Sequence, residues 1–492
     1  MSRRLGLGLA ALAGLLHIGG FAPFELYALQ VGALAALFWL CREGSDRAIA
    51  VRAFAFAFVW LGVGLWWLYI SLHDFGHLPA PLAALAVALL AAFLASYYAL
   101  ALGLAARWST GPWRWPALVG AWLLAELARG TWFTGFPWIA SGYAHAVGPL
   151  AAWAPWVGVY GLALLAAVMA AGAASGRRLG LLALLGPLLV GLALPQSFTT
   201  PTGTARLSLV QPSIPQDQKF DPDRFQAHLD TLAELVGQAR GDAVITPESV
   251  VPLPLVYLGN DYLDRLASHG RPVLLGSFLG TAEQGYVNSL VAVGTAVGTA
   301  VGTAPYDYGK HHLLPFGEVI PPGFEWFVRV LHIPMDSQAR GQHTRPWVVG
   351  GQRLRPLICF EDLFGEEIVD SLQGPEAATV LVNVSNLAWF GSFMSLDQHL
   401  QFSQMRALEF QRPVVRSTNT GVTAALDHHG RVQARLPALA RGVLEVEVEG
   451  REGSTPYARW LALLGLAPLW VAGGLLVAVA AWRTRAAPGR RP

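Results

Sequence analysis

Three residues of the chain have types and positions that could carry out nucleophilic chemistry. Cys359 ends a short apolar run and is followed at once by acids, as when a strand delivers a thiol to a turn. Glu248 and Lys310 each stand at the end of an apolar or strand-like segment. A carboxylate that removes the thiol proton, together with an ammonium that steadies the resulting charge, would supply the reactive thiolate. Cys41 lies beside arginines in a different kind of sequence, which argues against a disulfide, whereas a buried core cysteine remains the alternative use of Cys359.

Longer sequence motifs around these residues resemble those of a known family. Glutamate, lysine and cysteine in this chain order, with these flanks, resemble the catalytic set of the nitrilase superfamily. Together with phrases elsewhere, they resemble the apolipoprotein N-acyltransferases, the membrane-bound branch of that superfamily, over nearly the whole chain. The phrases are residues 310–318 (KHHLLPFGE), 383–386 (NVSN), 388–391 (AWFG), 405–409 (MRALE), 412–413 (RP), 20–24 (GFAPF) and 135–138 (GFPW).

The resemblance implies a role for each member of the set. Glu248 is the general base, Cys359 is the nucleophile, and Lys310 helps to hold the oxyanion that forms when an ester carbonyl is attacked. The backbone N–H of Phe360, just past the nucleophile, is expected to be a second oxyanion donor. If the three side chains pack in a partly dry pocket, their titrations are coupled.

Two further acids match positions of the family pattern. Glu318, eight residues after Lys310, is expected to orient that lysine or the incoming amine. Glu361 is expected to support the turn that carries the nucleophile. From the sequence, either acid could instead lie on the surface.

Four residues are predicted to line the substrate pocket. Asn386, Trp389 and Phe390 are expected to shape its wall, although Trp389 could equally belong to the core. Trp138 is one of several aromatic residues that crowd the outer side of the predicted spans, where such residues form an interfacial belt or line a lipid entrance.

The chain departs from the usual family pattern at four positions. Thr246 stands where a tryptophan commonly precedes Pro-Glu, and Leu387 where an aspartate commonly follows Ser-Asn. Phe360 replaces a common tyrosine, and Gly309 replaces an acid that often precedes the lysine. None of these changes removes a catalytic group, so they bear on substrate preference more than on reaction type.

The composition indicates a membrane protein. Hydrophobic residues make up 54% of the chain, charged residues only 13%, and there are 18 tryptophans, which is too apolar and aromatic for an ordinary soluble protein of this size. A net charge of +2 and the lack of a long basic run argue against nucleic acid as a partner. The histidine pairs at 311–312 and 428–429 lack the spacing of a zinc site, and no phosphate-binding glycine loop is present. We therefore expect no metal and no cofactor.

Eight apolar stretches are candidate membrane spans, seven before a polar region and one after it. The first resembles a signal peptide but lacks a clear cleavage site, so it is interpreted as an uncleaved helix. Some stretches fall short of the roughly 20 residues that a spanning helix needs, so their ends must extend into the flanking aromatic residues. The stretches are residues 5–20, 26–40, 53–70, 81–106, 116–127, a stretch within 149–174, 179–194 and 460–482.

Arginine positions predict the orientation of these spans. Arginines gather at both termini and in alternate loops, and Arg129 is the exception. Both termini are therefore expected in the cytoplasm, and the resemblance places the large polar segment on the periplasmic side of the bacterial inner membrane. The predicted domains are a seven-helix transmembrane domain at 1–195, a catalytic domain at 203–457, a transmembrane helix at 458–482 and a basic cytoplasmic tail at 483–492.

One acid lies where the fifth span ends. A carboxylate at the centre of a bilayer costs on the order of a few kcal/mol unless it is paired. Arg129, one turn after Glu126, is its expected partner, in an interfacial ion pair that fixes the end of the helix. A direct role in substrate binding is the alternative.

Beyond the seventh span, a polar linker at 197–203 leads to period-two patterns that indicate strands. Asp221 and Pro222 begin a helix as N-cap and first residue, and another helix covers residues 395–410. Strands and helices in alternation predict a layered α/β domain, which the resemblance makes specific as an α-β-β-α nitrilase-like sandwich. The tandem Val-Gly-Thr-Ala repeat at 293–304 is interpreted as an expanded hairpin turn. The predicted strands are residues 207–211, 244–246, 272–276, 354–358, 380–384, 413–417 and 443–448.

The resemblance implies an acyl transfer in two steps. Cys359 takes an acyl chain from a phospholipid as a thioester, and the α-amine of an N-terminal diacylglyceryl-cysteine on an apolipoprotein then takes the chain. The spans fit this scheme because both partners are lipids of the bilayer. One alternative is a membrane-anchored carbon–nitrogen hydrolase that uses the same triad with water. The other is a ligand-binding domain without catalysis on a transporter or receptor, against which the retained triad argues.

Overall fold

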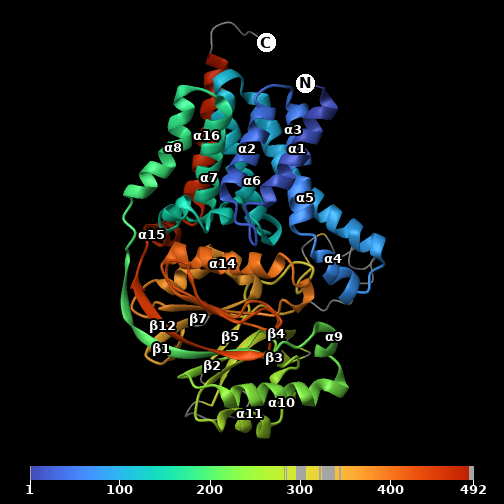
Figure 1. Ribbon diagram of the computed structural model, residues 1–492, viewed down its shortest axis with the longest axis vertical. Helices are drawn as coiled ribbons and strands as arrows, with labels where there is room; N and C mark the ends of the chain where they lie inside the picture. Colours follow the sequence, from blue (N-terminus) through green and yellow to red (C-terminus); the bar gives the residue numbers. More distant parts are fainter. Residues whose placement is uncertain are drawn as a thin grey trace. The chain divides into compact units, whose positions relative to one another are not determined.

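The chain forms two compact units, which Figure 1 draws in the colours of the sequence. One unit joins Met1–Ser197 to Arg459–Pro492 and is built of helices, and the other, Phe198–Ala458, carries the β-sheets. The computed structural model describes residues 2–281, 283, 285–294, 306–320, 323, 338–342 and 345–486.

Long apolar helices make up most of the helical unit. Among the described residues, four segments are long and apolar enough to cross a membrane, namely Asp46–Gly64, Ala80–Trp108, Pro149–Ser175 and Ala467–Ala486. This finding indicates association with a membrane, while the count of eight spans stays a prediction. The long helices are α1 (Arg3–Ile18), α2 (Tyr27–Cys41), α3 (Asp46–Gly64), α5 (Ala80–Trp108), α6 (Arg114–Thr131), α7 (Ala154–Ser175), α8 (Arg178–Ala193) and α16 (Ala467–Ala486).

Two helices differ from the predicted spans for local reasons. Helix α3 begins at Asp46 rather than at residue 53, because the Ser45 side chain caps it by accepting a hydrogen bond from the Ala48 N–H at 3.3 Å. The last stretch, expected to be continuous over 460–482, is broken into α15 (Pro456–Leu464) and α16. Gly465 ends α15 in the left-handed conformation, with φ of +55°, as glycines commonly do at helix ends.

The ion pair expected between Glu126 and Arg129 is present and fully buried in the helical unit. The Arg129 Nη2 atom lies 3.1 Å from Glu126 Oε2. The other carboxylate oxygen accepts a hydrogen bond from the backbone N–H of Ser141, and Arg129 also donates to the carbonyls of Phe136 and Trp138. The pair therefore fastens the end of α6 to the segment that follows it.

Two six-stranded sheets form the centre of the second unit. The first has the order β12 (Gly442–Gly453), β1 (Thr199–Gln211), β2 (Ala243–Ile245), β3 (Val273–Thr281), β4 (Gly285–Val293) and β5 (Asp307–Gly309). The second has the order β11 (Val432–Arg435), β10 (Ala424–Leu426), β9 (Val414–Thr418), β8 (Val380–Ser385), β7 (Gln352–Ile358) and β6 (Trp347–Val349). Within them, β1, β2 and β3 run parallel, as do β7, β8 and β9, and the remaining neighbours are antiparallel.

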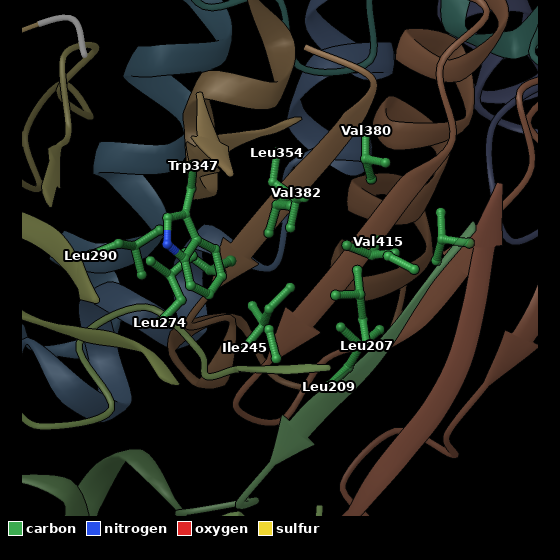
Figure 2. Close-up of a cluster of buried hydrophobic side chains, with 14 of the residues drawn as sticks. Leu207, Leu209, Ile245, Leu274, Leu290, Trp347, Leu354, Val380, Val382 and Val415 are labelled. Carbon is green, nitrogen blue, oxygen red and sulfur yellow. The ribbon is translucent and has the colours of Figure 1, made fainter. Parts of the chain in front are cut away.

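The two sheets pack face to face around an apolar core, mostly aliphatic but including Trp347, which Figure 2 shows in close-up. Because side chains alternate along a strand, Leu207 and Leu209 of β1 enter this core, whereas Val210 faces the other way. Val210 packs with the apolar faces of α10 (Pro222–Gln238) and α11 (Asn260–Ala267). Helix α14 (Ser395–Phe410) packs against β9 of the second sheet. The layers are therefore helix, sheet, sheet and helix, as the resemblance implied.

The seven predicted strands overlap β1, β2, β3, β7, β8, β9 and β12, and the predicted helices are α10 and α14. The linker was placed wrongly, because residues 199–203 form the first part of β1 and Thr199 pairs with Gly453. Proline and glycine are typical of loops, but here Pro201 and Gly203 lie at a bulge of the strand. The Val-Gly-Thr-Ala repeat beyond Gly294 and the basic tail beyond Ala486 lie outside the described residues.

Candidate active site

Glu248, Lys310 and Cys359 come from three strands and meet in the second unit. Each lies just beyond the carboxyl end of its strand: Glu248 follows β2, Lys310 follows β5, and Cys359 follows β7. Strands β2 and β5 belong to one sheet and β7 to the other. All three side chains are buried. The sandwich therefore brings a carboxylate, an ammonium and a thiol into one largely dry place.

The Glu248 carboxylate is held by donors on both of its oxygens. Oε1 accepts hydrogen bonds from Asn288 Nδ2 at 2.8 Å and from Lys310 Nζ at 3.3 Å. Oε2 accepts one from the backbone N–H of Asn386 at 2.8 Å. The turn that carries Glu248 lies flat on β3, where a Cβ atom at Gly276 would come within 2.0 Å of the Pro247 carbonyl oxygen.

The Lys310 ammonium lies between two carboxylates. Its Nζ atom donates to Glu318 Oε1 at 2.8 Å as well as to Glu248. Burial by itself lowers the pKa of Lys310, but the charges of Glu248 and Glu318 outweigh it, so the pKa lies well above its ordinary value. Lys310 is therefore a permanent cation of the site. The other oxygen of Glu318 accepts a hydrogen bond from the Leu314 N–H, which fixes the carboxylate against the lysine.

Cys359 has the backbone conformation of a sharp turn. Its φ is +54°, a value that residues other than glycine rarely adopt, and the Asn383 amide donates to its carbonyl at 3.3 Å. The charges of Glu248 and Lys310 both act on its thiol. Burial, followed by the charge of Glu248, raises the pKa of the thiol well above its ordinary value, although Lys310 opposes this. The thiol is therefore protonated at neutral pH, and its proton must leave as it attacks.

Glu361 ties the turn of the nucleophile to the segment that carries the lysine. One of its oxygens accepts hydrogen bonds from the Ile358 N–H at 2.7 Å and the Tyr308 hydroxyl at 2.8 Å. The other oxygen accepts from the N–H groups of His311 at 2.7 Å and His312 at 3.2 Å. Glu361 is thus a buried support of the site and not a surface acid.

The arrangement can carry out covalent acyl chemistry. A carboxylate grouped with a protonated thiol can act as general base, and a fixed ammonium in the same group can stabilise an oxyanion. Among the described residues, no three histidine, cysteine or acidic side chains are grouped as ligands for a metal ion.

Comparison with known proteins identifies the family of the chain. A family model described as the apolipoprotein N-acyltransferase N-terminal domain matches residues 13–172, and one described as carbon-nitrogen hydrolase matches residues 261–457. An apolipoprotein N-acyltransferase of Verminephrobacter eiseniae is 44% identical over 503 residues, which cover 93% of this chain and 92% of that protein. The chain belongs to the apolipoprotein N-acyltransferase family. A further member, from Ralstonia nicotianae, is 42% identical and covers 98% of this chain and 94% of its own.

Among solved structures, a carbon–nitrogen hydrolase superfamily protein of Xanthomonas campestris matches 54% of this chain and 96% of its own, with 20% identity and a TM-score of 0.36. The match to the carbon-nitrogen hydrolase model includes Lys310 and Cys359. Glu248 lies before the start of that match, at residue 261.

The four residues predicted to line a pocket lie in different parts of the structure. Asn386 is part of the site, since its N–H binds Glu248. Trp389 is half-buried and Phe390 is buried, both in the short helical turn Ala388–Phe390 that follows. Trp138 belongs to the helical unit, where its ring centroid lies 4.7 Å from that of Trp67. A pocket role for the three aromatic residues stays a prediction.

Asn288 is a member of the site that the sequence analysis did not single out. Its Nδ2 atom donates to Glu248 at 2.8 Å and lies 3.4 Å from Glu318 Oε1, so it bridges the two carboxylates that flank Lys310. Its backbone carbonyl accepts a hydrogen bond from the Lys310 N–H at 2.8 Å. An asparagine in the strand pattern of β4 gave no signal by itself. Pairing of β4 with β5 is what places it.

Asp362 and Arg416 form a second group that was not predicted. They make a fully buried ion pair at 3.3 Å beneath the turn of Cys359, and both also bind the Ser403 hydroxyl. Burial raises the pKa of Asp362, and the charge of Arg416 opposes it. The pair fastens the nucleophile turn to α14 and β9.

Two of the departures from the family pattern have a structural reason. Thr246 is buried, donates to the Leu274 carbonyl at 3.1 Å and accepts from the Gly276 N–H at 3.0 Å, so it joins β2 to β3 where a tryptophan is common. At Gly309 a Cβ atom would come within 2.8 Å of Gly341, so an acid does not fit there without a shift.

Proposed function

We propose that this family member transfers a fatty acyl chain from a phospholipid to the α-amine of the N-terminal diacylglyceryl-cysteine of an apolipoprotein, through a thioester on Cys359. The observation that carries the proposal is the buried group of Cys359, Glu248 and Lys310, in which the Glu248 carboxylate binds Lys310 and its charge acts on the Cys359 thiol. The support from relatives is that proteins named apolipoprotein N-acyltransferase match nearly the full length of the chain.

In the first half of the reaction, the thiol sulfur attacks the carbonyl carbon of a phospholipid ester. Glu248 accepts the thiol proton as the S–C bond forms, and the negative charge moves to the carbonyl oxygen. Lys310 and the backbone N–H of Phe360 are the proposed donors to that oxyanion. The C–O bond then breaks, and Glu248 returns the proton to the departing lysophospholipid oxygen.

In the second half, the α-amine of the diacylglyceryl-cysteine attacks the thioester carbonyl. A C–N bond forms, the C–S bond breaks, and a proton of the amine passes through Glu248 to the cysteine sulfur. Glu318 and Glu361 act through other groups in this scheme. Glu318 holds Lys310, and Glu361 holds the nucleophile turn.

Transfer is favoured over the two alternatives by the extent of the relationship. A family model named for the N-terminal domain of the acyltransferase matches the helical segment 13–172, which a hydrolase that uses water would not require. A binding domain without catalysis would not require a thiol, a base and an ammonium in contact.

The membrane arrangement is part of the proposal. Eight helices span the bacterial inner membrane, seven before the catalytic domain and one after it, with both termini in the cytoplasm. The catalytic domain then lies on the periplasmic side. The distribution of arginines in the chain supports this orientation.

Reporter fusions test this orientation. An alkaline phosphatase fused after Gly203 should be active, and a cytoplasmic reporter at the same point should be inactive, because the arginine bias directs this segment outward. Fusions after Ser175, in the loop that contains Arg177 and Arg178, should give the reverse pattern and serve as the control. Activity of only the cytoplasmic reporter after Gly203 would contradict both the orientation and the access to lipoproteins.

Intact-protein mass tests the reaction. Incubation of the full-length protein with a phospholipid of known chains should add the mass of one fatty acid less one water, because a thioester is stable enough to accumulate. Addition of a diacylglyceryl peptide with a free α-amine should then return the protein to its original mass and increase the mass of the peptide by the same amount. The matched control is the same peptide with an acetylated amine, which should leave the adduct in place. Loss of the adduct at the same rate with water alone would identify a hydrolase.

A further inference from the structure

The basic residues of the chain are almost all arginines. Among the 34 lysines and arginines there are two lysines, Lys219 and Lys310. Both are buried, and both act on the charge of Glu248. An ammonium is compact and changes its protonation readily when buried, whereas a guanidinium keeps its charge. The two lysines are therefore coupled to the charge of one carboxylate, Lys310 through a direct ion pair.

Lys219 lies at the end of the short helix α9 (Gln216–Lys219), between β1 and α10. Its Nζ atom donates to the Ser249 hydroxyl at 2.9 Å. Ser249 follows Glu248 directly and has a φ of +43°, a conformation that serine rarely adopts. Since such a turn must be held by its surroundings, the bond from Lys219 helps to hold the residue next to the base.

The other end of α9 reaches the same carboxylate by a second route. The Gln216 side-chain oxygen accepts a hydrogen bond from Asn386 Nδ2 at 3.0 Å, and the Asn386 N–H donates to Glu248 Oε2. The short helix α9 thus holds both Ser249, which follows Glu248 in the chain, and Asn386, which binds its carboxylate. Both of its bracing side chains are buried.

Lys219 adds a second buried positive charge to the group around Glu248. With the thiol protonated, Glu248 and Glu318 bring two negative charges, and Lys310 brings one positive charge. Lys219 supplies the second. Of the other acids beside the nucleophile, Glu361 has Arg355 as a charged neighbour and Asp362 pairs with Arg416.

We propose that Lys219 is a positioning residue for the acyl transfer, one that holds the Glu248 turn and balances the second carboxylate so that Glu248 stays ionised as the base. The proposal rests on the proposed function. A buried carboxylate without enough nearby positive charge binds a proton more readily, and a protonated Glu248 cannot accept one from the thiol.

The behaviour of Lys219 in the folded protein fits this role. Burial lowers the pKa of Lys219 to about 8, although Glu248 opposes the shift. Lys219 is therefore charged at neutral pH, where the site would work. Among the described residues, the charged or titratable groups coupled to Glu248 are Lys219 from α9, Lys310 after β5, Cys359 after β7 and, through Lys310, Glu318.

The test is the pH profile of Cys359 in the full-length protein, in a Cys41→Ala background that leaves one thiol. Two rates are measured: acyl loading from phospholipid, and alkylation by iodoacetamide. Lys219→Met and Lys219→Gln should move the acid limb of both profiles to higher pH by about one unit, the lower end of the usual effect of a neighbouring opposite charge. Lys219→Arg keeps the charge and should keep the acid limb in place.

Two more variants separate charge from packing. Ser249→Ala removes the hydrogen bond and leaves the charge, so it should slow loading by up to about 10² through misplacement of the base, with the acid limb unmoved. Arg265→Met removes a distant exposed cation, which pairs with Asp230 at 2.7 Å, and should change neither rate. Thermal unfolding identifies any variant that has not folded.

The proposal is overturned if the acid limb does not move in a folded Lys219→Met or Lys219→Gln variant. It is also overturned if the acid limb moves by the same amount in Arg265→Met. Should both neutral variants fail to fold, a shifted acid limb in the charge-retaining Lys219→Arg variant would overturn it. If the wild-type protein is alkylated but never acylated, the proposed function is wrong. The alkylation profile then still decides the role of Lys219.

Discussion

Replacement of Cys359 by alanine should abolish the acyl adduct, whereas replacement of Cys41 by alanine should leave it intact. The chain has two cysteines, and Cys359 is the one that lies in the sheet-bearing unit, where the charge of Glu248 acts on its thiol. Without its sulfur, no group of the site can form a thioester. Loss of an enzyme nucleophile typically costs about 10⁶ in rate, so acyl transfer to a lipopeptide should fall below detection. Intact mass after incubation with phospholipid measures the adduct, and release of lysophospholipid gives an independent readout.

Serine at position 359 is the matched control for this prediction. It preserves the size and the turn, with its positive φ, but is a weaker nucleophile than a thiol, so it should retain the fold and lose nearly all of the activity. An adduct of full occupancy in Cys359→Ala would mean that another residue carries the acyl group and that the nucleophile is assigned wrongly.

The strands of the second unit could be predicted because each carries its own signal. Alternation of apolar residues marked β1 and β12, and short apolar runs marked β2, β8 and β9. The start of β1 could not be predicted, because Pro201 and Gly203 are also the residues of a loop, and only pairing with β12 makes them part of a strand. The break between α15 and α16 was missed for a similar reason. Gly465 within an apolar stretch does not reveal its left-handed conformation.

The chemistry-bearing residues and two supporting acids, Glu318 and Glu361, could be singled out from the sequence, and the other supporting contacts could not. Glu248, Lys310 and Cys359 each follow a strand, and a resemblance to a family singled them out. Asn288 and Lys219 have no such signal. An amide in a strand and a lysine in a polar turn are common on surfaces, and only the tertiary fold buries them against Glu248. The ion pair of Glu126 and Arg129 could be predicted in part. The spacing of the two residues on a helix predicted the pair, but only the fold shows that it is fully buried.

Glu248 and Lys310 should be distinguishable because a base and an oxyanion donor act at different moments. Glu248→Gln keeps the size of the side chain and its acceptor for the Asn386 N–H, but cannot accept the thiol proton. The thiol of Cys359 is protonated at neutral pH, since burial and the charge of Glu248 raise its pKa. Acyl loading should therefore fall by about 10²-fold or more in this variant, the usual scale of general base catalysis.

Lys310→Met keeps the length of the stem and removes the charge, so it should depress both loading from phospholipid and transfer to the amine, by about 10² to 10³ each, because each half passes through an oxyanion. Lys310→Arg is the control that keeps a cation between Glu248 and Glu318. Single-turnover loading, followed by a chase with lipopeptide amine, measures the two halves separately. If Lys310→Met loads and transfers at the wild-type rates, Lys310 serves only to pair the two carboxylates, and the oxyanion must be held by backbone N–H groups alone.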